Sequence, residues 1–296
     1  MRPASMIIRR RRSFLPGRRL LLALGGLLAI GGCAVPASPS DPSSAALEAD
    51  YILLGEVHDN AEGHARRLDW LRAMPNGPRR AIVFEQFDLG HQAAIDRWRE
   101  MRPDERGPAA AKNLAQAGGF EFRGWRFESY GPVIELALER GWDIRAGNLP
   151  RTEAMRIARD PAAAAPPPPG WPAAADAALE SAVRKGHCGL VPEERVEAMA
   201  LAQRSRDAGM AQAMRAARDD GAAQVLLIAG NGHVRRDYGV PAHLRGAQPD
   251  ARIFALGFIE SGNGGGRNRF DAVRMVPPAD RPDPCAQLRE HFGGRK

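Results

Sequence analysis

Residues 51–60 read YILLGEVHDN, and this stretch decides the fold. Its first four residues are apolar and suit a strand that is buried on both faces, as strands of parallel sheets are. A glycine ends the apolar run, and Glu56, His58 and Asp59 come directly after it. Ligands bind beyond the carboxyl ends of strands in open parallel sheets. The stretch therefore predicts a buried strand that delivers polar groups to a site at the edge of a sheet.

Apolar runs and helical patterns alternate along the rest of the chain. The candidate strands are residues 51–54, 80–85, 142–146, 223–229, 252–257 and 271–276. Helical patterns occupy residues 60–74, 89–101, 107–117, 128–140 and 193–219. Alternation of this kind predicts an α/β fold with a mainly parallel sheet flanked by helices.

Polar residues or glycines come after several of these strands. Glu85 follows AIVF, Asn148 follows the run WDIRAG, and the segment Gly230-Asn231-Gly232-His233 follows VLLIA. The carboxyl ends of parallel strands lie at one edge of the sheet, so these residues should converge there with Glu56 and His58.

Two Gly-x-x-His elements, ending in His58 and His233, flank the strand that ends in Glu85. Two histidines and a carboxylate suit a divalent transition metal with an open coordination position. Glu56 would then act as general base on a bound water. Simpler explanations stay open: Glu85 pairs with an arginine or caps a helix, and Gly230 and Gly232 serve a sharp turn at positive φ.

The helices beside these strands carry further polar residues. Asp59 is expected to cap the helix at 60–74, with Glu62 completing a capping box. His64 lies on the apolar face of that helix, either as a core residue or lining the site. Gln203 and Asp207 share a stripe with the methionines of the helix at 193–219, which predicts that this helix meets the site.

The first 33 residues have the pattern of an export signal. Seven arginines and no acidic residue precede or flank an apolar run from Leu20 to Ile30, followed by Gly31-Gly32-Cys33. A membrane-spanning helix needs about 20 residues, so this run is too short. The ending resembles a lipobox, with residues 1–32 as signal peptide and Cys33 as the lipidated residue. The alternatives are an uncleaved anchor, a secretory signal without lipid, and, at residues 11–15, a twin-arginine signal.

Removal of this leader changes the expected chemistry of the mature chain. The whole chain has 42 basic and 35 acidic side chains, and without the seven leader arginines the two kinds balance. Net charge therefore gives no support for nucleic-acid binding. Residues 33–46 are expected to form a lipidated tether, and residues 47–296 a single α/β domain with a Pro/Ala-rich insertion at 161–175. Cys188 and Cys285 would form a disulfide in an oxidising compartment.

The motifs LLGEVHDN, IVFEQF and IAGNGHVRRDYGVP, in this order, resemble the ChaN family of bacterial iron-regulated lipoproteins in the haem-binding-uptake and Tiki superfamily. Residues 186–192 and 202–211 fit the same pattern, and the resemblance spans roughly residues 48–277. It implies a protein that binds haem or iron for acquisition at the cell envelope. Because Ala34 rather than Asp follows Cys33, we expect the periplasmic side of the outer membrane. A haem or iron source, an outer-membrane haem receptor and a second copy of the chain are the partners that it implies.

The resemblance also implies site residues. Wider relatives, the Tiki proteases and erythromycin-esterase-like proteins, use a glutamate and two histidines that correspond to Glu85, His58 and His233, so a metal-dependent hydrolase is the alternative function. Haem would be noncovalent, because the chain has no Cys-x-x-Cys-His attachment motif. The candidate haem-binding residues are His64, Tyr130, His187 and Tyr238. Arg235 and Arg236 are candidate partners for the propionates, and the methionines of residues 193–219 are candidates for the apolar wall.

Overall fold

The computed structural model describes residues 41–262 and 266–293. The predicted signal peptide, Cys33 and the first part of the predicted tether lie outside the described residues. Within the described residues, a short helix α1 (Ser44–Leu47) precedes the first strand of the sheet.

Six parallel strands form the sheet, as the alternation of apolar runs predicts. They are β1 (Tyr51–Glu56), β2 (Arg80–Asp88), β3 (Asp143–Asn148), β4 (Gln224–Gly230), β5 (Ile253–Glu260) and β6 (Ala272–Val276). Their order across the sheet is β3-β2-β4-β1-β5-β6. Connections from β1 run toward β2, whereas those from β4 run toward β5 on the other side of β1. The order therefore reverses around β1 and β4, and such a reversal opens a crevice at the carboxyl ends.

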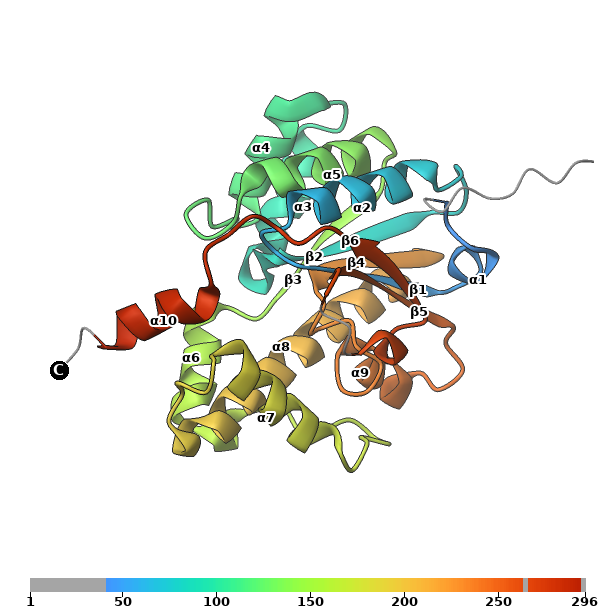
Figure 1. Ribbon diagram of the computed structural model, residues 1–296. Helices are drawn as coiled ribbons and strands as arrows, with labels where there is room; N and C mark the ends of the chain where they lie inside the picture. Colours follow the sequence, from blue (N-terminus) through green and yellow to red (C-terminus); the bar gives the residue numbers. More distant parts are fainter. Residues whose placement is uncertain (1–40, 263–265, 294–296) are drawn as a thin grey trace, which may run out of the picture. The chain divides into compact units, whose positions relative to one another are not determined.

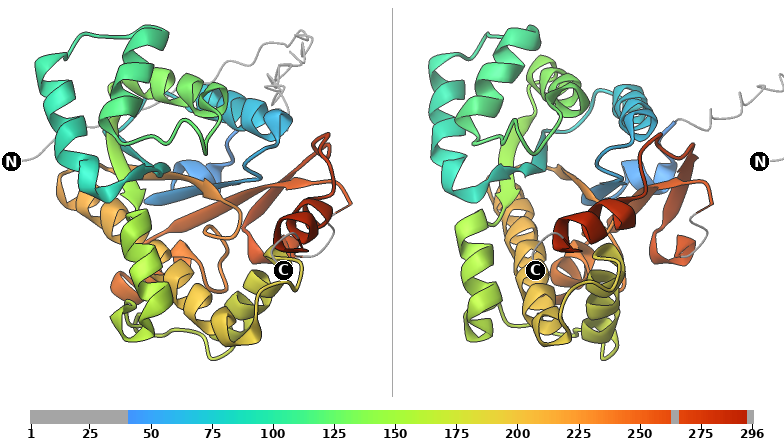
Figure 2. Two further views of the ribbon diagram at one scale, coloured as in Figure 1. Left: turned by 90° about the vertical axis from the view of Figure 1, so that its left-hand side faces the viewer. Right: turned by 60° about the vertical axis from the view of Figure 1, so that its left-hand side comes forward.

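Helices cover both faces of the sheet (Figures 1 and 2). On one face lie α2 (Ala61–Ala73), α3 (Gln92–Met101), α4 (Gly107–Ala117) and α5 (Phe127–Glu139), and on the other lie α8 (Glu193–Asp219) and α9 (Val240–Ala247). Side chains alternate along a strand, so each strand contributes to two cores. In β1, Ile52 and Leu54 enter the first core, and Tyr51 and Leu53 enter the second.

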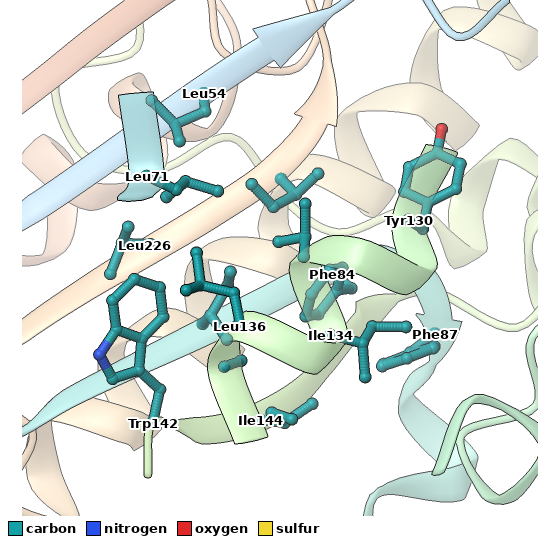
Figure 3. Packing of buried hydrophobic residues seen from close by; sticks show 14 of the residues in the cluster. Leu54, Leu71, Phe84, Phe87, Tyr130, Ile134, Leu136, Trp142, Ile144 and Leu226 are labelled. Atoms are coloured by element: carbon teal, nitrogen blue, oxygen red, sulfur yellow. The ribbon is translucent and has the colours of Figure 1, made fainter. Parts of the chain in front are cut away.

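The first core joins the strands to α2 and α5 (Figure 3). Leu54, Phe84 and Leu226 of the sheet lie in the same buried cluster as Leu71 of α2 and Ile134 of α5. Each such side chain stabilises the fold by about 1.5–3 kcal/mol when fully buried. This packing fixes the start of α2 and the start of α5 near the carboxyl end of β1, where the polar residues lie.

The remaining elements are shorter or were not predicted from the sequence. They are η1 (Leu89–His91), α6 (Arg151–Arg159), η2 (Pro161–Ala163), α7 (Ala175–Gly186), η3 (Arg267–Arg269) and α10 (Pro284–Gly293). Cys188, just after α7, and Cys285, in α10, are joined as a disulfide with their Cα atoms 5.6 Å apart. This is the pairing that the cysteine count suggested, and it ties the C-terminal helix to the end of α7. No helix of the described residues has the length and apolar character to cross a membrane.

Two local expectations about the polar loops are wrong. The cap of α2 is Asn60, whose side chain accepts a hydrogen bond from the Gly63 N–H at 2.7 Å, whereas Asp59 pairs with Arg281. Gly230 and Gly232 do not have positive φ. Gly230 is needed because a Cβ there would lie 2.8 Å from atoms of the His58 ring. The glycine thus provides space for an imidazole rather than an unusual backbone conformation.

Candidate functional site

Glu56, the last residue of β1, lies inside a buried cluster of charges. Arg67 of α2, which has no exposed surface, forms an ion pair with Glu56 Oε2, and Tyr130 of α5 donates its hydroxyl to Oε1. Burial lowers the pKa of Arg67 to about 10, so the guanidinium keeps its charge at neutral pH. Burial raises the pKa of Tyr130, so its hydroxyl remains a donor. Glu56 is therefore a fixed anion surrounded by donors, rather than the freely accessible base that its position in the sequence suggested.

Two histidines lie against this anion. His58 Nδ1 is 3.1 Å from Glu56 Oε1, and the His58 side chain is 44% exposed. His64 is buried and donates from Nε2 to the carbonyl oxygen of His58 at 2.9 Å. Burial lowers the pKa of both histidines, which favours neutral rings at pH 7. His64 therefore holds the loop, and His58 presents a neutral imidazole toward solvent.

A second cluster surrounds His233, after β4. Its Nδ1 lies 2.5 Å from Asp207 Oδ1 on α8, and its Nε2 lies 3.3 Å from Glu85 Oε1. The other oxygen of Glu85 accepts the Gly230 N–H at 2.7 Å. All three side chains are buried. This arrangement confirms the expectation that the helix at 193–219 meets the site.

Electrostatics make His233 a cation. Burial opposes its charge, but Glu85 and Asp207 outweigh burial and raise its pKa to about 10. Burial likewise opposes the charge of Glu85, and His233 with His58 brings its pKa down to about 2. Burial raises the pKa of Asp207 to about 6 despite the imidazolium beside it. The amide of Gln203 lies 2.8 Å from His233 Nε2, and a protonated ring requires the amide oxygen at that position.

His58 connects the two clusters. Its ring lies against Gly230, where a Cβ would be 2.8 Å from His58 Nε2 and 3.7 Å from Glu85 Oε2. The ring also meets the edge of Trp125, with centroids 4.8 Å apart. The structure thus brings His58, Glu85 and His233 together, as the strand ends predicted. Arg67 was not anticipated, because an arginine within an otherwise polar helix gives no signal that it will be buried.

The donors do not support the predicted divalent metal. Within the described ranges, 41–262 and 266–293, no three His, Cys, Asp or Glu side chains are grouped so that they could hold a metal ion. Both nitrogens of His233 face carboxylates, with Nδ1 2.5 Å from Asp207 and Nε2 3.3 Å from Glu85. The predicted ligand set of His58, Glu85 and His233 is a hydrogen-bonded ion-pair network instead.

The four candidate haem-binding residues do not form one site. His64 and Tyr130 pack around Glu56, with their ring centroids 5.2 Å apart. His187 lies at the end of α7 and bonds the carbonyl of Val183. Tyr238 follows His233 and packs under Arg235. All three tyrosines of the chain are buried, at 2% exposure or less.

The methionines expected to form a haem wall are also placed elsewhere. Met210 and Met214 are fully buried in the core between α8 and the sheet. Met199 packs against the small apolar cluster between α7 and α8. The methionine stripe of α8 is therefore core.

Two hollows flank the site at the carboxyl edge of the sheet. One, here called the basic pocket, has a volume of about 390 Å³ and lies between α7, the loop after β4 and the end of β5. Lys185, Arg235, Arg269 and Tyr238 line it. The other, here called the strand-edge cavity, has a volume of about 320 Å³ and lies beyond β2 and β3. Glu85 lines the strand-edge cavity, and no residue lines both hollows.

These features define a class of protein: a parallel α/β domain with a histidine–carboxylate network at the reversal of its strand order. Residues 43–244 match the family described as haem-binding uptake, Tiki superfamily, ChaN, and the chain belongs to this family. No curated protein matches the chain in sequence.

One solved structure agrees on the fold, and two others are more distantly similar. ChaN of Campylobacter jejuni, described with cofacial haem binding, is 21% identical and has a TM-score of 0.64, covering 77% of this chain and 87% of its own. The type III effector HopBA1 is 12% identical with a TM-score of 0.42, covering 79% and 90%. A mutant erythromycin esterase EreC in its open conformation is 16% identical with a TM-score of 0.41, covering 84% and 82%.

Proposed function

We propose that this chain binds haem noncovalently in the basic pocket and serves haem or iron acquisition at the cell envelope. Membership of the haem-binding uptake family supports the ligand. The observation that carries the choice of pocket is the combination of apolar walls with three cationic side chains, Lys185, Arg235 and Arg269. A haem needs both, because it is a flat apolar disc that carries two propionates.

The apolar part of the pocket comes from four segments of the chain. Val57 follows β1, Ala178 and Ala182 face it from α7, and Ile259 of β5 and Phe270 complete the wall. These side chains give a porphyrin edge a surface to pack on, as ligand pockets commonly do. A porphyrin is too large to be wholly enclosed by a pocket of about 390 Å³. The part that stays outside would face a second copy of the chain, and we propose such a homodimer by analogy with cofacial binding in the Campylobacter protein.

Two of the three cations of the pocket share one carboxylate, and Glu260, which also lines the pocket, pairs with Arg281. Arg235 pairs with Asp237, and Arg269 lies 3.8 Å from the same carboxylate. Lys185 on α7 is exposed. Two guanidiniums on one carboxylate leave positive charge for the propionates, which guanidinium groups bind through charge-assisted hydrogen bonds. Arg236, the other candidate from the sequence, pairs with Asp271 at 3.0 Å and does not line the pocket.

Tyr238 is the one of the four predicted haem-binding residues that lines the basic pocket. Arg235 stacks on its ring at 4.0 Å from the centroid, and burial raises the pKa of its hydroxyl to about 12. The phenol is therefore protonated at neutral pH and would give up its proton on binding iron. Haem would supply the iron that the protein carries, and Tyr238 would position it.

Haemin titration followed at the Soret band tests this function. Wild type should saturate, and Arg235→Met and Arg269→Met should each weaken binding by about tenfold or more, because a hydrogen bond to a charged group is worth about 1.5–3 kcal/mol. Arg236→Met, from the same loop, is the matched control and should bind like wild type. Tyr238→Phe should shift the Soret maximum. Absence of saturation, or equal affinity in all variants, would contradict the proposal.

A hydrolase remains the second candidate, and the Glu56–His58 pair favours it. His58 is neutral, half-exposed and held through Nδ1 by a buried carboxylate, as a general base must be. One variant distinguishes haem binding from hydrolysis. His58→Ala should leave haemin affinity unchanged if haem binding is the function, and it should abolish ester or peptide cleavage if the protein is a hydrolase.

A further inference from the structure

We propose that the disulfide between Cys188 and Cys285 is a redox-sensitive clamp on the basic pocket, and that its reduction by a dithiol lets α7 move and opens the pocket. The inference rests on the proposed function for the ligand, haem, whose access the clamp would control. One wall of the pocket is α7, and the other is the end of β5 with η3. The chain continues from β6 through segment 277–283 to α10 (Figure 1), and the disulfide joins α10 back to the end of α7.

Segment 277–283 is attached to the sheet side of the pocket. The Ala279 N–H donates to Glu260 Oε1 at 2.9 Å. Arg281 donates to Glu260 Oε2 at 2.5 Å and to Asp59 at 2.7 Å. Glu260 ends β5 and lines the basic pocket, so these contacts fix the segment beside that wall.

The disulfide holds the other end of the C-terminal segment. Among the α10 side chains that the structure describes, none belongs to a buried hydrophobic cluster. Arg289 and the Cys285 N–H donate to Asp283, which belongs to the same segment. Cys188 and Cys285 are both half-buried, so a small dithiol can reach them. Breaking the S–S bond therefore frees this end from α7.

The wall formed by α7 is the one that can move. Its buried side chains belong to a small apolar cluster with α8 and Tyr238, to which no strand of the described part of the chain contributes. Alanines make up much of this contact, and Ala178 and Ala182 also line the basic pocket. Small side chains bury little apolar area, so they hold α7 less strongly than the main cores hold their helices. Local opening occurs preferentially in such parts of a fold.

The backbone at the end of α7 is held in an uncommon conformation. Cys188 has a φ of 57° and is, among the described residues, the single non-glycine residue in the left-handed region. Gly189 follows in the same region, and its N–H donates to the Arg184 carbonyl at 2.8 Å. Such a conformation persists where the surrounding structure holds it. Reduction removes one of these restraints, three residues from Lys185, which lines the pocket.

Reduction is a two-electron exchange. A thiolate of the dithiol attacks one sulfur of the protein disulfide, the S–S bond breaks, and a mixed disulfide forms. The second thiol of the dithiol then attacks the mixed disulfide. Cys188 and Cys285 end as thiols and the dithiol ends as a disulfide, so two electrons and two protons have moved to the protein. Exchange with an oxidised dithiol runs the same steps in reverse and closes the clamp.

Amide hydrogen exchange of the full-length protein tests the clamp without a ligand. Protein reduced with dithiothreitol and then alkylated should exchange the amides of residues 175–189 faster than oxidised protein. Peptides from α5, in the main core, report any loss of global stability, so the rise in α7 should exceed the rise in α5. No rise in α7, or an equal rise in both helices, would overturn the clamp.

Stopped-flow mixing with ferric haemin, after removal of the reductant, tests the effect on the pocket. The reduced, alkylated protein should bind haemin about tenfold faster or more, because association is slowed when binding requires a conformational change. Cys188→Ser/Cys285→Ser should match it and should not respond to dithiothreitol. Equal rates in oxidised and reduced protein, with saturation in both, would overturn the clamp and leave haem binding intact. Absence of binding in both forms would refute haem binding, and amide exchange would still decide the clamp.

A pair of arginine variants tests the attachment to the sheet. Arg281→Met removes the contacts with Asp59 and Glu260 and keeps the disulfide, so it should speed haemin association in oxidised protein. Arg289→Met, whose partner Asp283 lies in the same segment, is the matched control and should behave like wild type. Wild-type association in Arg281→Met would overturn a clamp built on this segment.

Discussion

Arg67 and His233 each carry a positive charge in the interior, and each is neutralised by carboxylates from other elements of the fold. Arg67 depends on Glu56, and His233 depends on Glu85 and Asp207. Removing one partner of a buried pair leaves an uncompensated charge and typically costs about 3–5 kcal/mol. These residues therefore link the site to the stability of the fold.

We predict that the pH dependence of stability reports the charge on His233. Its pKa rises from 6.5 to about 10 on folding, so the folded state binds the proton more tightly than the unfolded state. This contribution is fully present below about pH 6.5 and is lost as the pH rises through about 10. Urea unfolding between these limits should show a falling free energy of unfolding. His233→Gln should flatten that fall, and an identical slope in both proteins would contradict the assigned protonation.

At the scale of elements, strands were predicted better than helices. All six strands were found because a doubly buried strand is nearly all apolar, and β4 reads QVLLIAG. Helices α1, α6, α7, α9 and α10 were missed. Segment 161–175 is rich in proline and alanine, and the next helix, α7, is mostly alanine and charged residues. Alanine fits either a core or a surface, so such a helix has little amphipathic pattern to detect.

We predict that the link between α7 and α10 stabilises the protein. The disulfide closes a loop with a sequence separation of 97 residues. For a loop of this length the chain-entropy estimate is about 4 kcal/mol, which is an upper guide. The double variant Cys188→Ser/Cys285→Ser should lower the free energy of unfolding by up to that amount. In wild-type protein from the envelope, non-reducing peptide mapping should recover the linked peptides, and free thiols at both positions would refute the pairing.

At the scale of the whole molecule, the cellular location that we propose depends on the first 33 residues. The described part of the chain contains no helix that could cross a membrane. From the apolar run that ends in Gly31-Gly32-Cys33, we propose that a lipid on Cys33 holds the domain at the outer membrane, where it would meet a haem receptor.

We predict that mass spectrometry of the mature protein finds an acylated Cys33 at its N-terminus. Cys33→Ser should abolish acylation and move the protein out of the membrane fraction, because the lipid would be its anchor. An unmodified N-terminus at another residue would refute lipidation, and fractionation of wild type with the inner membrane would refute the outer-membrane location.

The sequence by itself determined the α/β class, the six strands and the convergence of His58, Glu85 and His233, because these depend on apolar runs and on the polar residues directly after each run. Only the tertiary structure showed the strand order, the burial of Arg67 and the ion pair between His233 and Asp207. It also decided that the tyrosines are buried and that two hollows flank the network. The physical reason is the distance along the chain over which residues interact. A local pattern shows that a strand is buried on both faces. Which strands lie beside it, and which residue pairs with each charge, depend on contacts between different elements of the fold.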